Sequence, residues 1–175
     1  MPQTYKLGDP EADDTTIGPV VSLRSATTIR EHVAEATLTG AESLIPESHY
    51  PAAKNETPYV APVVLVNVSH EMRVMKEETF GPVIPIMKVT SDEEALTLIN
   101  DTDFGLTTSI WTKDEKAFEQ LVDRVDSGTV FMNRADYLDP ALPWTGVKDS
   151  GRGISLSRYG FDAVTRAKSV HIRAT

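Results

Sequence analysis

Two adjacent carboxylates stand in the stretch Glu77-Glu78-Thr79-Phe80-Gly81-Pro82-Val83, which runs through an aromatic residue and a Gly-Pro corner into an apolar segment. Such a corner places a charged side chain and an exposed aromatic ring at the end of a strand. In α/β proteins, the crevice at the strand ends usually holds the ligand. The carboxylate of Glu78 and the ring of Phe80 are therefore candidates for ligand binding, although glutamates at a corner are also common as solvated surface residues.

A second set of candidate residues lies in residues 133–153, a stretch rich in Pro and Gly that predicts a long irregular loop. Long loops inside compact domains are commonly functional. Asp136, Tyr137 and Asp139 are candidates for proton transfer, because a carboxyl group in a half-apolar cleft acquires a raised pKa and becomes a usable acid or base. Trp144 is a candidate for a ligand-binding surface and equally for a core or lid residue.

The composition argues against several other chemistries. With no cysteine among 175 residues, the chain offers no disulfide, no thiolate zinc site and no thiol nucleophile. Its four histidines lack the paired spacing of a helical metal site, so we expect no metal and read each of them as surface or structural. No Gly-x-Ser-x-Gly elbow supports a serine triad.

The charge and hydropathy narrow the class of protein. A net charge of −9 and a pI near 4.9 repel nucleic-acid phosphates and anionic membrane surfaces. The sequence also contains no apolar run of transmembrane length and no secretory signal. We therefore expect a cytoplasmic protein that binds neither nucleic acid nor membranes and that has a small molecule as its possible ligand.

The elements that would position the candidate residues alternate between strands and helices. A helix is expected to begin at Ser25 and to end at Gly40, and its apolar face comprises Ile29, Val33, Ala36 and Leu38. Apolar runs predict strands at 59–66, 83–89, 106–111 and 129–132. Capping boxes predict the starts of two further helices, one at Ser91 with Glu94 and one at Thr112 with Glu115.

The last three strands and the two helices between them form two successive strand-helix-strand units. Units of this length require right-handed crossovers and parallel pairing. We therefore predict a three-layer α/β/α fold with a mainly parallel sheet, in one domain over residues 1–175. A short helix is expected at 158–166, and the alternating residues 169–173 predict an edge strand without a partner.

Taken together with its surroundings, the 77–83 stretch resembles the aldehyde dehydrogenase superfamily. The resemblance includes Met72-Arg73-Val74-Met75-Lys76 before the corner and Asp103-Phe104-Gly105-Leu106 after it. It extends over nearly the whole chain, from Leu7-Gly8-Asp9-Pro10 through Ile17-Gly18-Pro19-Val20 to Lys168-Ser169-Val170-His171. The fold that it implies is the C-terminal part of the family's catalytic domain.

The resemblance also implies roles for individual residues. The family oxidises aldehydes through a cysteine thiohemiacetal and passes hydride to NAD(P). Glu78 matches the carboxylate that binds the nicotinamide ribose hydroxyls, and Phe80 matches the aromatic residue beside the nicotinamide. Trp144 stands in the place of an aromatic residue of the aldehyde tunnel. The strand at 169–173 resembles the family's oligomerisation strand, so a homo-oligomer is expected.

Two parts of the family's machinery do not match any residue here, namely the cysteine nucleophile and the dinucleotide-binding domain. We therefore expect a truncated aldehyde dehydrogenase-like protein with vestigial cofactor residues, no cofactor of its own and no dehydrogenase activity alone. Two alternatives stay open. One is a repurposed scaffold that performs cofactor-free isomerisation or cyclisation in a biosynthetic pathway with Glu78, Asp136, Tyr137 and Asp139. The other is an oligomerisation or binding module.

Overall fold

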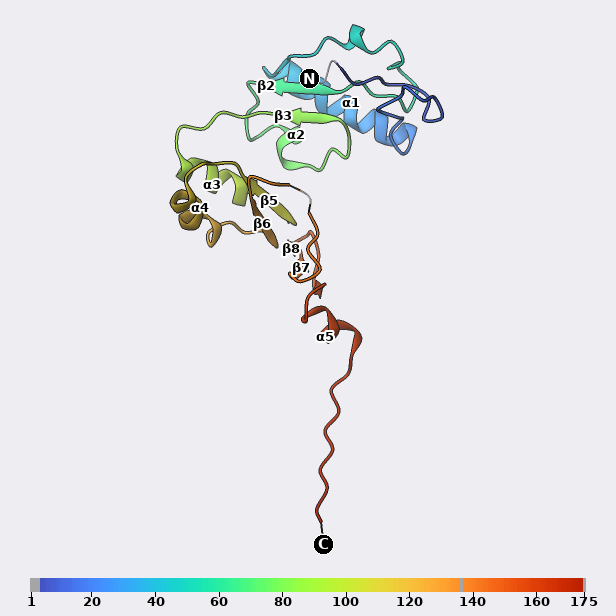
Figure 1. Cartoon of the computed structure of the whole chain (residues 1–175). Coiled ribbons are helices and arrows are strands. Elements are labelled where there is room, and N and C mark those ends of the chain that lie inside the picture. The colour runs from blue at the N-terminus through green and yellow to red at the C-terminus, as the bar shows by residue number, and fades with distance from the viewer. Residues whose placement is uncertain (1–3, 136, 175) are drawn as a thin grey trace. The chain divides into compact units, whose positions relative to one another are not determined.

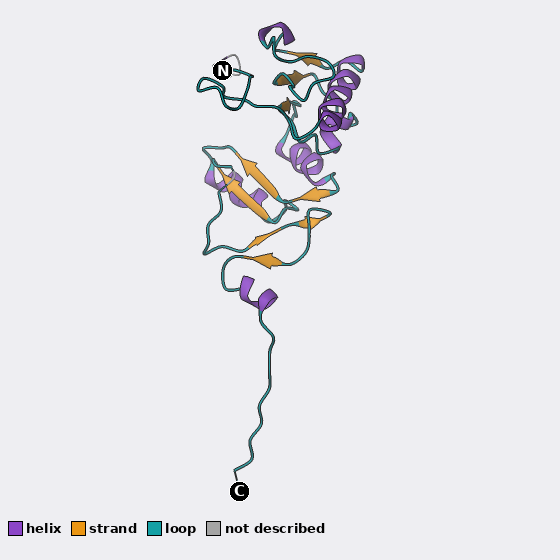
Figure 2. Cartoon of the chain, turned by 90° about the vertical axis from the view of Figure 1, so that its right-hand side faces the viewer, coloured by secondary structure: helices purple, strands orange, loops and turns teal. Residues whose placement is uncertain are grey.

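The computed structural model describes residues 4–135 and 137–174. They form two compact units, Met1–Val89 and Thr90–Thr175. Both units contain helices and short strands (Figure 1, Figure 2), which confirms the predicted α/β class. None of the described helices combines the length and the apolar character that crossing a bilayer requires. The single domain expected from the sequence stays a prediction.

Helix α1, Leu23–Leu38, is the longest element of the first unit. It begins before the predicted position because Ser22, in extended conformation, is the N-cap, and its Oγ accepts a hydrogen bond from the Ser25 backbone N–H at 3.0 Å. Ser25 thus lies within the first turn. The predicted end is confirmed, since Gly40 has a φ of +113°, a conformation that favours glycine just beyond a helix.

The buried face of α1 differs in part from the predicted one. Val33 is half-buried and Leu38 is 88% exposed in the last turn, so Leu38 does not belong to the apolar face. The buried side chains follow the helical spacing and comprise Ala26, Ile29, His32 and Ala36. A histidine thus occupies a core position on this helix.

The first unit has one three-stranded sheet of order β1-β2-β3, with β1 antiparallel and β3 parallel to β2. Its strands are β1 (Glu42–Ser43), β2 (Val63–Val66) and β3 (Val83–Pro85), and its short helices are η2 (Glu47–His49) and α2 (Arg73–Lys76). Figure 1 shows β2 and β3 side by side.

Both long strands of this sheet are shorter than predicted. β2 starts only at Val63, because Pro62 before it has no N–H to donate. β3 ends at Pro85, and the last pairing hydrogen bond runs from the Ile86 N–H to the Leu65 carbonyl. Beyond this point β2 has turned away, since Asn67 has a φ of 58°.

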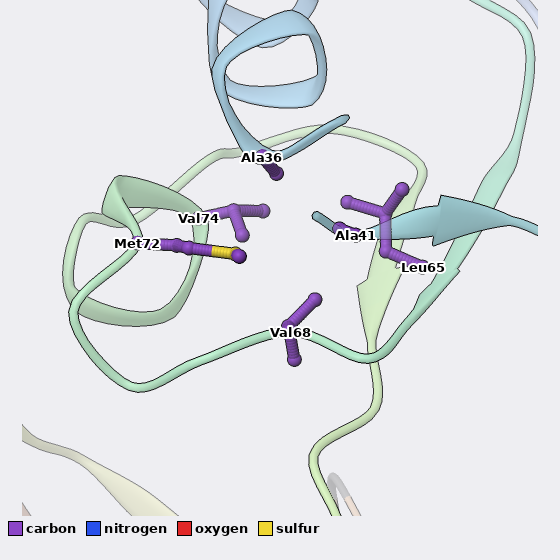
Figure 3. Packing of buried hydrophobic residues seen from close by; sticks show 6 residues of the cluster. All are labelled: Ala36, Ala41, Leu65, Val68, Met72 and Val74. Atoms are coloured by element: carbon purple, nitrogen blue, oxygen red, sulfur yellow. The ribbon is translucent and has the colours of Figure 1, made fainter. Parts of the chain in front are cut away.

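The core of the first unit lies between α1, α2 and the sheet. Six buried side chains converge there (Figure 3), namely Ala36, Ala41, Leu65, Val68, Met72 and Val74. Two further clusters complete it, one around Leu7, Ile45 and Tyr50 and one around Ala26 and Ile29. The first unit thus closes its own apolar interior.

The second unit consists of short elements. Its helices are α3 (Asp92–Asn100), α4 (Glu115–Val122) and α5 (Gly160–Val164). Its strands are β4 (Phe104–Gly105), β5 (Thr107–Ile110), β6 (Thr129–Met132), β7 (Trp144–Thr145), β8 (Val147–Lys148) and β9 (Ile154–Ser155). They form three two-stranded sheets, β4-β8, β5-β6 and β7-β9.

One of the two predicted strand-helix-strand units is confirmed. β5 and β6 pair in parallel, with α4 between them in sequence. The pairing in the other unit, between the strands at 83–89 and 106–111, stays a prediction, because β3 belongs to the first unit and β5 to the second. Within the first unit, β3 pairs with β2. The loop at 133–153 also contains β7 and β8, which the sequence did not indicate.

The two predicted capping boxes have different outcomes. Ser91 caps α3 by accepting from the Glu94 N–H at 3.2 Å, and the Glu94 carboxylate turns back to the Thr90 N–H at 2.7 Å. The second box was wrong. Asp114 caps α4, because its Oδ1 accepts from two backbone N–H groups of the first turn. The Thr112 Oγ1 accepts from the Asp114 N–H, which lies before the helix. A carboxylate is also favoured at the positive end of the helix dipole.

The C-terminal segment has less structure than the sequence indicated. The final helix covers five residues, 160–164, instead of 158–166. Residues 169–173 form no strand in this single chain (Figure 2), and the apolar side chains of Val170 and Ile172 are 71% and 83% exposed. The strand is not formed here because an edge strand needs a partner, and the described chain supplies none.

Candidate functional site

In the corner after α2, residues 77, 79 and 81 lie against α1, and of these Thr79 is half-buried. Glu77 and Thr79 are hydrogen-bonded to His32 of α1, and Gly81 packs so closely on Ile29 that a Cβ there would lie 2.5 Å from the Ile29 Cδ1. The even-numbered residues of the corner, 78 and 80, are exposed. The corner therefore presents Glu78 and Phe80 outward from a fixed base.

Glu77 is the anchor of this corner. Its Oε1 accepts from Arg73 Nε at 2.8 Å, and its Oε2 accepts from Arg73 Nη2 at 3.0 Å and from His32 Nε2 at 3.1 Å. The hydrogen bonds from Arg73 are the main reason that the pKa of the Glu77 carboxyl lies below its ordinary value, with a smaller contribution from His32. The same pairing raises the pKa of the Arg73 guanidinium. Arg73 also approaches Glu35 of α1 at 3.5 Å.

Glu78 and Phe80 have the opposite environment. Within the described residues the Glu78 carboxylate accepts no hydrogen bond, and the Phe80 side chain is 82% exposed. Phe80 also has a φ of 43°, in the left-handed region that bulky side chains rarely adopt. Backbone strain of this kind costs about 1–3 kcal/mol and gathers at ligand-binding sites. The carboxylate of Glu78 and the ring of Phe80 are thus both exposed at the corner.

The loop of the second unit brings three predicted residues together. Tyr137, Asp139 and Trp144 line one cavity of about 130 Å³. Arg134 joins them, with its guanidinium carbon 3.5 Å from the centre of the Tyr137 ring. Asp136, the fourth predicted residue of this loop, lies outside the described residues. Glu78 and Phe80 belong to the first unit, so the candidates form two separate sets.

Two residues of this cavity have structural contacts that limit their freedom. Asp139 Oδ1 accepts from the Ala141 backbone N–H at 2.9 Å, which ties the carboxylate to its own turn. Trp144 is half-buried in β7 and is paired with Ser155 of β9. The Tyr137 side chain, 48% exposed, is the freest of the three.

Sequence reasoning missed the residues that support the corner. His32 stands three residues after Ile29 on the predicted apolar face, and a polar residue on such a face was the available signal. Nothing in the sequence around Arg134 indicated its contact with the Tyr137 ring. A larger cavity of about 510 Å³, between α1 and residues 43–63 of the first unit, contains none of the predicted site residues.

The structure offers no support for a metal site. Within residues 4–135 and 137–174, no three His, Asp or Glu side chains are arranged so that they could hold an ion. His32 is engaged by Glu77 and Thr79, which gives this buried histidine a structural role.

Nearly the whole chain is similar to proteins of one family. A profile of the aldehyde dehydrogenase family matches residues 2–170. An aldehyde dehydrogenase from Paenarthrobacter nicotinovorans is 38% identical over 93% of this chain and 35% of its own length. A succinate semialdehyde dehydrogenase, Sad from Escherichia coli, is 34% identical over 94% of this chain and 35% of its own length.

Solved structures agree with the sequences. The structure of an aldehyde dehydrogenase from Bacillus cereus has a TM-score of 0.85 at 30% identity, over 97% of this chain and 34% of that one. A succinate-semialdehyde dehydrogenase from Burkholderia pseudomallei has a TM-score of 0.84 at 30% identity, over 92% of this chain and 33% of that one. The chain spans about a third of the length of the relatives it matches. It belongs to the aldehyde dehydrogenase family.

Proposed function

We propose that this chain supplies the nicotinamide-side corner and one aldehyde-side wall of an aldehyde dehydrogenase catalytic site and does not oxidise aldehydes alone. The observation that carries the proposal is the anchored corner. Glu77 is tied down by Arg73 and His32, while Glu78 and Phe80 are exposed beside it. A site that must align a cofactor needs such a rigid base.

The exposed residues fit the nicotinamide riboside end of NAD(P). The Glu78 carboxylate has free oxygens for two ribose hydroxyls, and the Phe80 ring offers a flat apolar face. NAD(P), when bound, supplies the hydride acceptor. The sequence contains no G-x-G-x-x-G turn for the pyrophosphate. We therefore expect negligible affinity for the whole cofactor, so that a calorimetric titration with millimolar NAD is flat.

The lack of any cysteine defines what the chain cannot do by itself. In a family that works through a thiolate, neither aldehyde oxidation nor ester hydrolysis by a thiol route is available to it. The purified chain should not reduce NAD(P) with any aldehyde above a buffer blank. Turnover above that blank would contradict this part of the proposal.

A chimera tests the role of the corner. The chain would replace the matching third of the Paenarthrobacter nicotinovorans enzyme, and NAD(P) reduction would be measured. Glu78→Gln should lower kcat/KM about 10- to 100-fold, since a hydrogen bond to a charged group contributes about 1.5–3 kcal/mol. Glu119→Gln, at an exposed position of α4, is the matched control. Equal activities of the two variants would refute the assignment of Glu78.

One observation favours a second function, cofactor-free acid–base chemistry, because Tyr137 and Asp139 line the same cavity. The contact of Asp139 with Ala141 leaves Tyr137 as the better proton donor. The test is deuterium exchange at the carbon next to the carbonyl of a small aldehyde or ketone, followed by NMR. Exchange that Tyr137→Phe abolishes would establish this function, and exchange at the buffer rate would remove it.

Self-association is the third part of the proposal. Val170 and Ile172 are exposed in a segment without secondary structure, and such a segment gains backbone hydrogen bonds by adding to another strand. Deleting the residues from Lys168 onward should shift the mass from light scattering toward monomer or precipitate the protein. A full chain that stays monomeric well above a micromolar concentration, which corresponds to about −8 kcal/mol, would refute it.

A further inference from the structure

Among the described residues, His32 is the polar side chain with the most complete burial, at 1% exposure. Burying an imidazole is costly unless both ring nitrogens are satisfied. Here both are, and both partners lie on the corner after α2. Nε2 is 3.1 Å from Glu77 Oε2, and Nδ1 is 3.1 Å from Thr79 Oγ1. A core position is thus used to hold the corner.

The partners determine the protonation of the ring. An ionised carboxylate only accepts hydrogen bonds, so His32 Nε2 carries a hydrogen and donates it to Glu77. Nδ1 shares a hydrogen bond with the Thr79 hydroxyl. The ring nitrogen that faces Glu77, Nε2, is therefore the one expected to carry a hydrogen in the folded protein.

Two residues of α1 contact the corner at positions 77, 79 and 81. Ile29 and His32 are three residues apart and therefore share a face of the helix. Ile29 leaves no room for a side chain at position 81, and His32 engages positions 77 and 79. Contacts with one helical face thus hold positions 77, 79 and 81, although the Glu77 side chain stays 50% exposed. The two positions between them are exposed.

We propose that His32 is a positioning residue that fixes the direction of Glu78 and Phe80. The proposal rests on the proposed function, in which these two side chains meet the nicotinamide end of the cofactor. His32 itself touches neither of them and acts through Glu77 and Thr79. Without the two hydrogen bonds, the strained backbone at Phe80 is free to relax, and the pair loses its common orientation.

NMR of the full chain tests this without any cofactor. The imidazole ¹⁵N shifts of His32 should show a hydrogen on Nε2. Backbone order parameters at residues 78–80 should lie near about 0.85 in the native chain and fall below about 0.6 in His32→Phe, which keeps the burial and deletes both hydrogen bonds. Leu65→Ala is the control, since it opens the core without touching the corner.

The outcomes separate a positioning role from general stability. A loss of order at 78–80 in His32→Phe that is absent in Leu65→Ala supports the proposal. Unchanged order parameters, or an Nε2 without a hydrogen in the native chain, overturns it. If His32→Phe does not fold, Thr79→Val decides, because this half-buried position tolerates the isosteric change and the same loss of order is expected. If Glu78→Gln leaves the activity of the chimera unchanged, that result refutes the proposed function and not the positioning role of His32.

Discussion

The two units of this chain differ in how they bury apolar surface. The first unit has three clusters of buried side chains around α1 and its sheet. Among the described residues of the second unit, the buried apolar side chains are Leu96 and Val125. Its longest strands, β5 and β6, contain no buried residue. The first unit therefore has an interior of its own, whereas the second exposes much of the surface that a core would use.

The difference in apolar burial implies a difference in stability between the two units. Half-buried strands gain only part of the free energy of apolar burial, about 25 cal/mol per Å² removed from water. Large apolar side chains of the second unit, including Trp111, Leu142 and Phe161, are more than half exposed. Exposed patches of this kind usually meet another surface. We therefore expect the second unit to be the less stable of the two.

The largest expected effect is a core truncation. Leu65 is fully buried in the first unit, so Leu65→Ala should lower the free energy of unfolding by about 2–5 kcal/mol. Leu121 of α4 in the second unit is only half-buried, and Leu121→Ala should cost about 1 kcal/mol because part of the side chain already lies in water. Urea unfolding of both variants measures this.

Tryptophan fluorescence and far-UV circular dichroism report on the two units separately. The chain has two tryptophans, Trp111 and Trp144, and both lie in the second unit, whereas α1 is the longest helix and contributes strongly to the far-UV circular dichroism. In the native chain the fluorescence midpoint should fall below the dichroism midpoint. Coincident transitions would show a single cooperative unit instead. They would contradict the lower stability expected for the second unit.

A smaller effect is expected at the corner of the first unit. In Gly81→Ala the new methyl group would lie 2.5 Å from Ile29 Cδ1, so the packing must shift, at a cost of about 1–3 kcal/mol. Ile29→Val removes that methyl and should recover part of the loss in the double variant. A double-mutant cycle from urea midpoints measures the coupling. Strictly additive effects would contradict the contact between the two residues.

Local signals predicted most of the longer elements and one strand pairing. The strand at 129–132 and the parallel pairing with 107–110 followed from short-range patterns, because a helix of this length between two strands permits one arrangement. The strand at 83–89 was overestimated. Its pairing depends on where β2 turns away at Asn67, which no pattern within the strand itself contains.

The candidate site shows the same limit. Motif reasoning selected Glu78 and Phe80, which are exposed, and Tyr137, Asp139 and Trp144, which line one cavity, while their roles stay predictions. The anchoring residues were missed, since the hydrogen bond between His32 and Glu77 joins positions 45 residues apart. A contact between residues so far apart produces no periodic pattern in the sequence. Only the folded chain reveals it.

The helix caps allow a matched comparison at about 1 kcal/mol each. Ser22→Ala removes the cap of α1 in the first unit, and Asp114→Ala removes the cap of α4 in the second. If the units unfold separately, Ser22→Ala should lower the dichroism midpoint and Asp114→Ala the fluorescence midpoint. Thr112→Ala, at the position first expected to cap α4, should change little. Equal losses for Thr112→Ala and Asp114→Ala would contradict the assigned cap.

The smallest expected effect is a pH dependence that each unit carries through one arginine–glutamate pair. Hydrogen bonds from Arg73 lower the pKa of Glu77 in the first unit, and those from Arg124 lower the pKa of Glu93 in the second, both from an ordinary value of 4.5. A carboxyl group whose folded pKa is depressed adds stability above its unfolded pKa and loses it as the pH falls through the folded value. Stability should therefore decline below about pH 4.5.

The two pairs can be removed one at a time. Arg73→Met should flatten the acid dependence of the dichroism midpoint, and Arg124→Met that of the fluorescence midpoint, with each variant leaving the other probe unchanged. Both pairs are solvent-exposed, so raising the salt concentration should weaken both effects. Glu77 differs from Glu93 in one respect, because it also accepts from the buried His32. Arg73→Met should accordingly leave an acid dependence that falls further when His32→Phe is added. The lowered pKa values of Asp14 in the first unit and Glu94 in the second leave a smaller acid dependence in both variants.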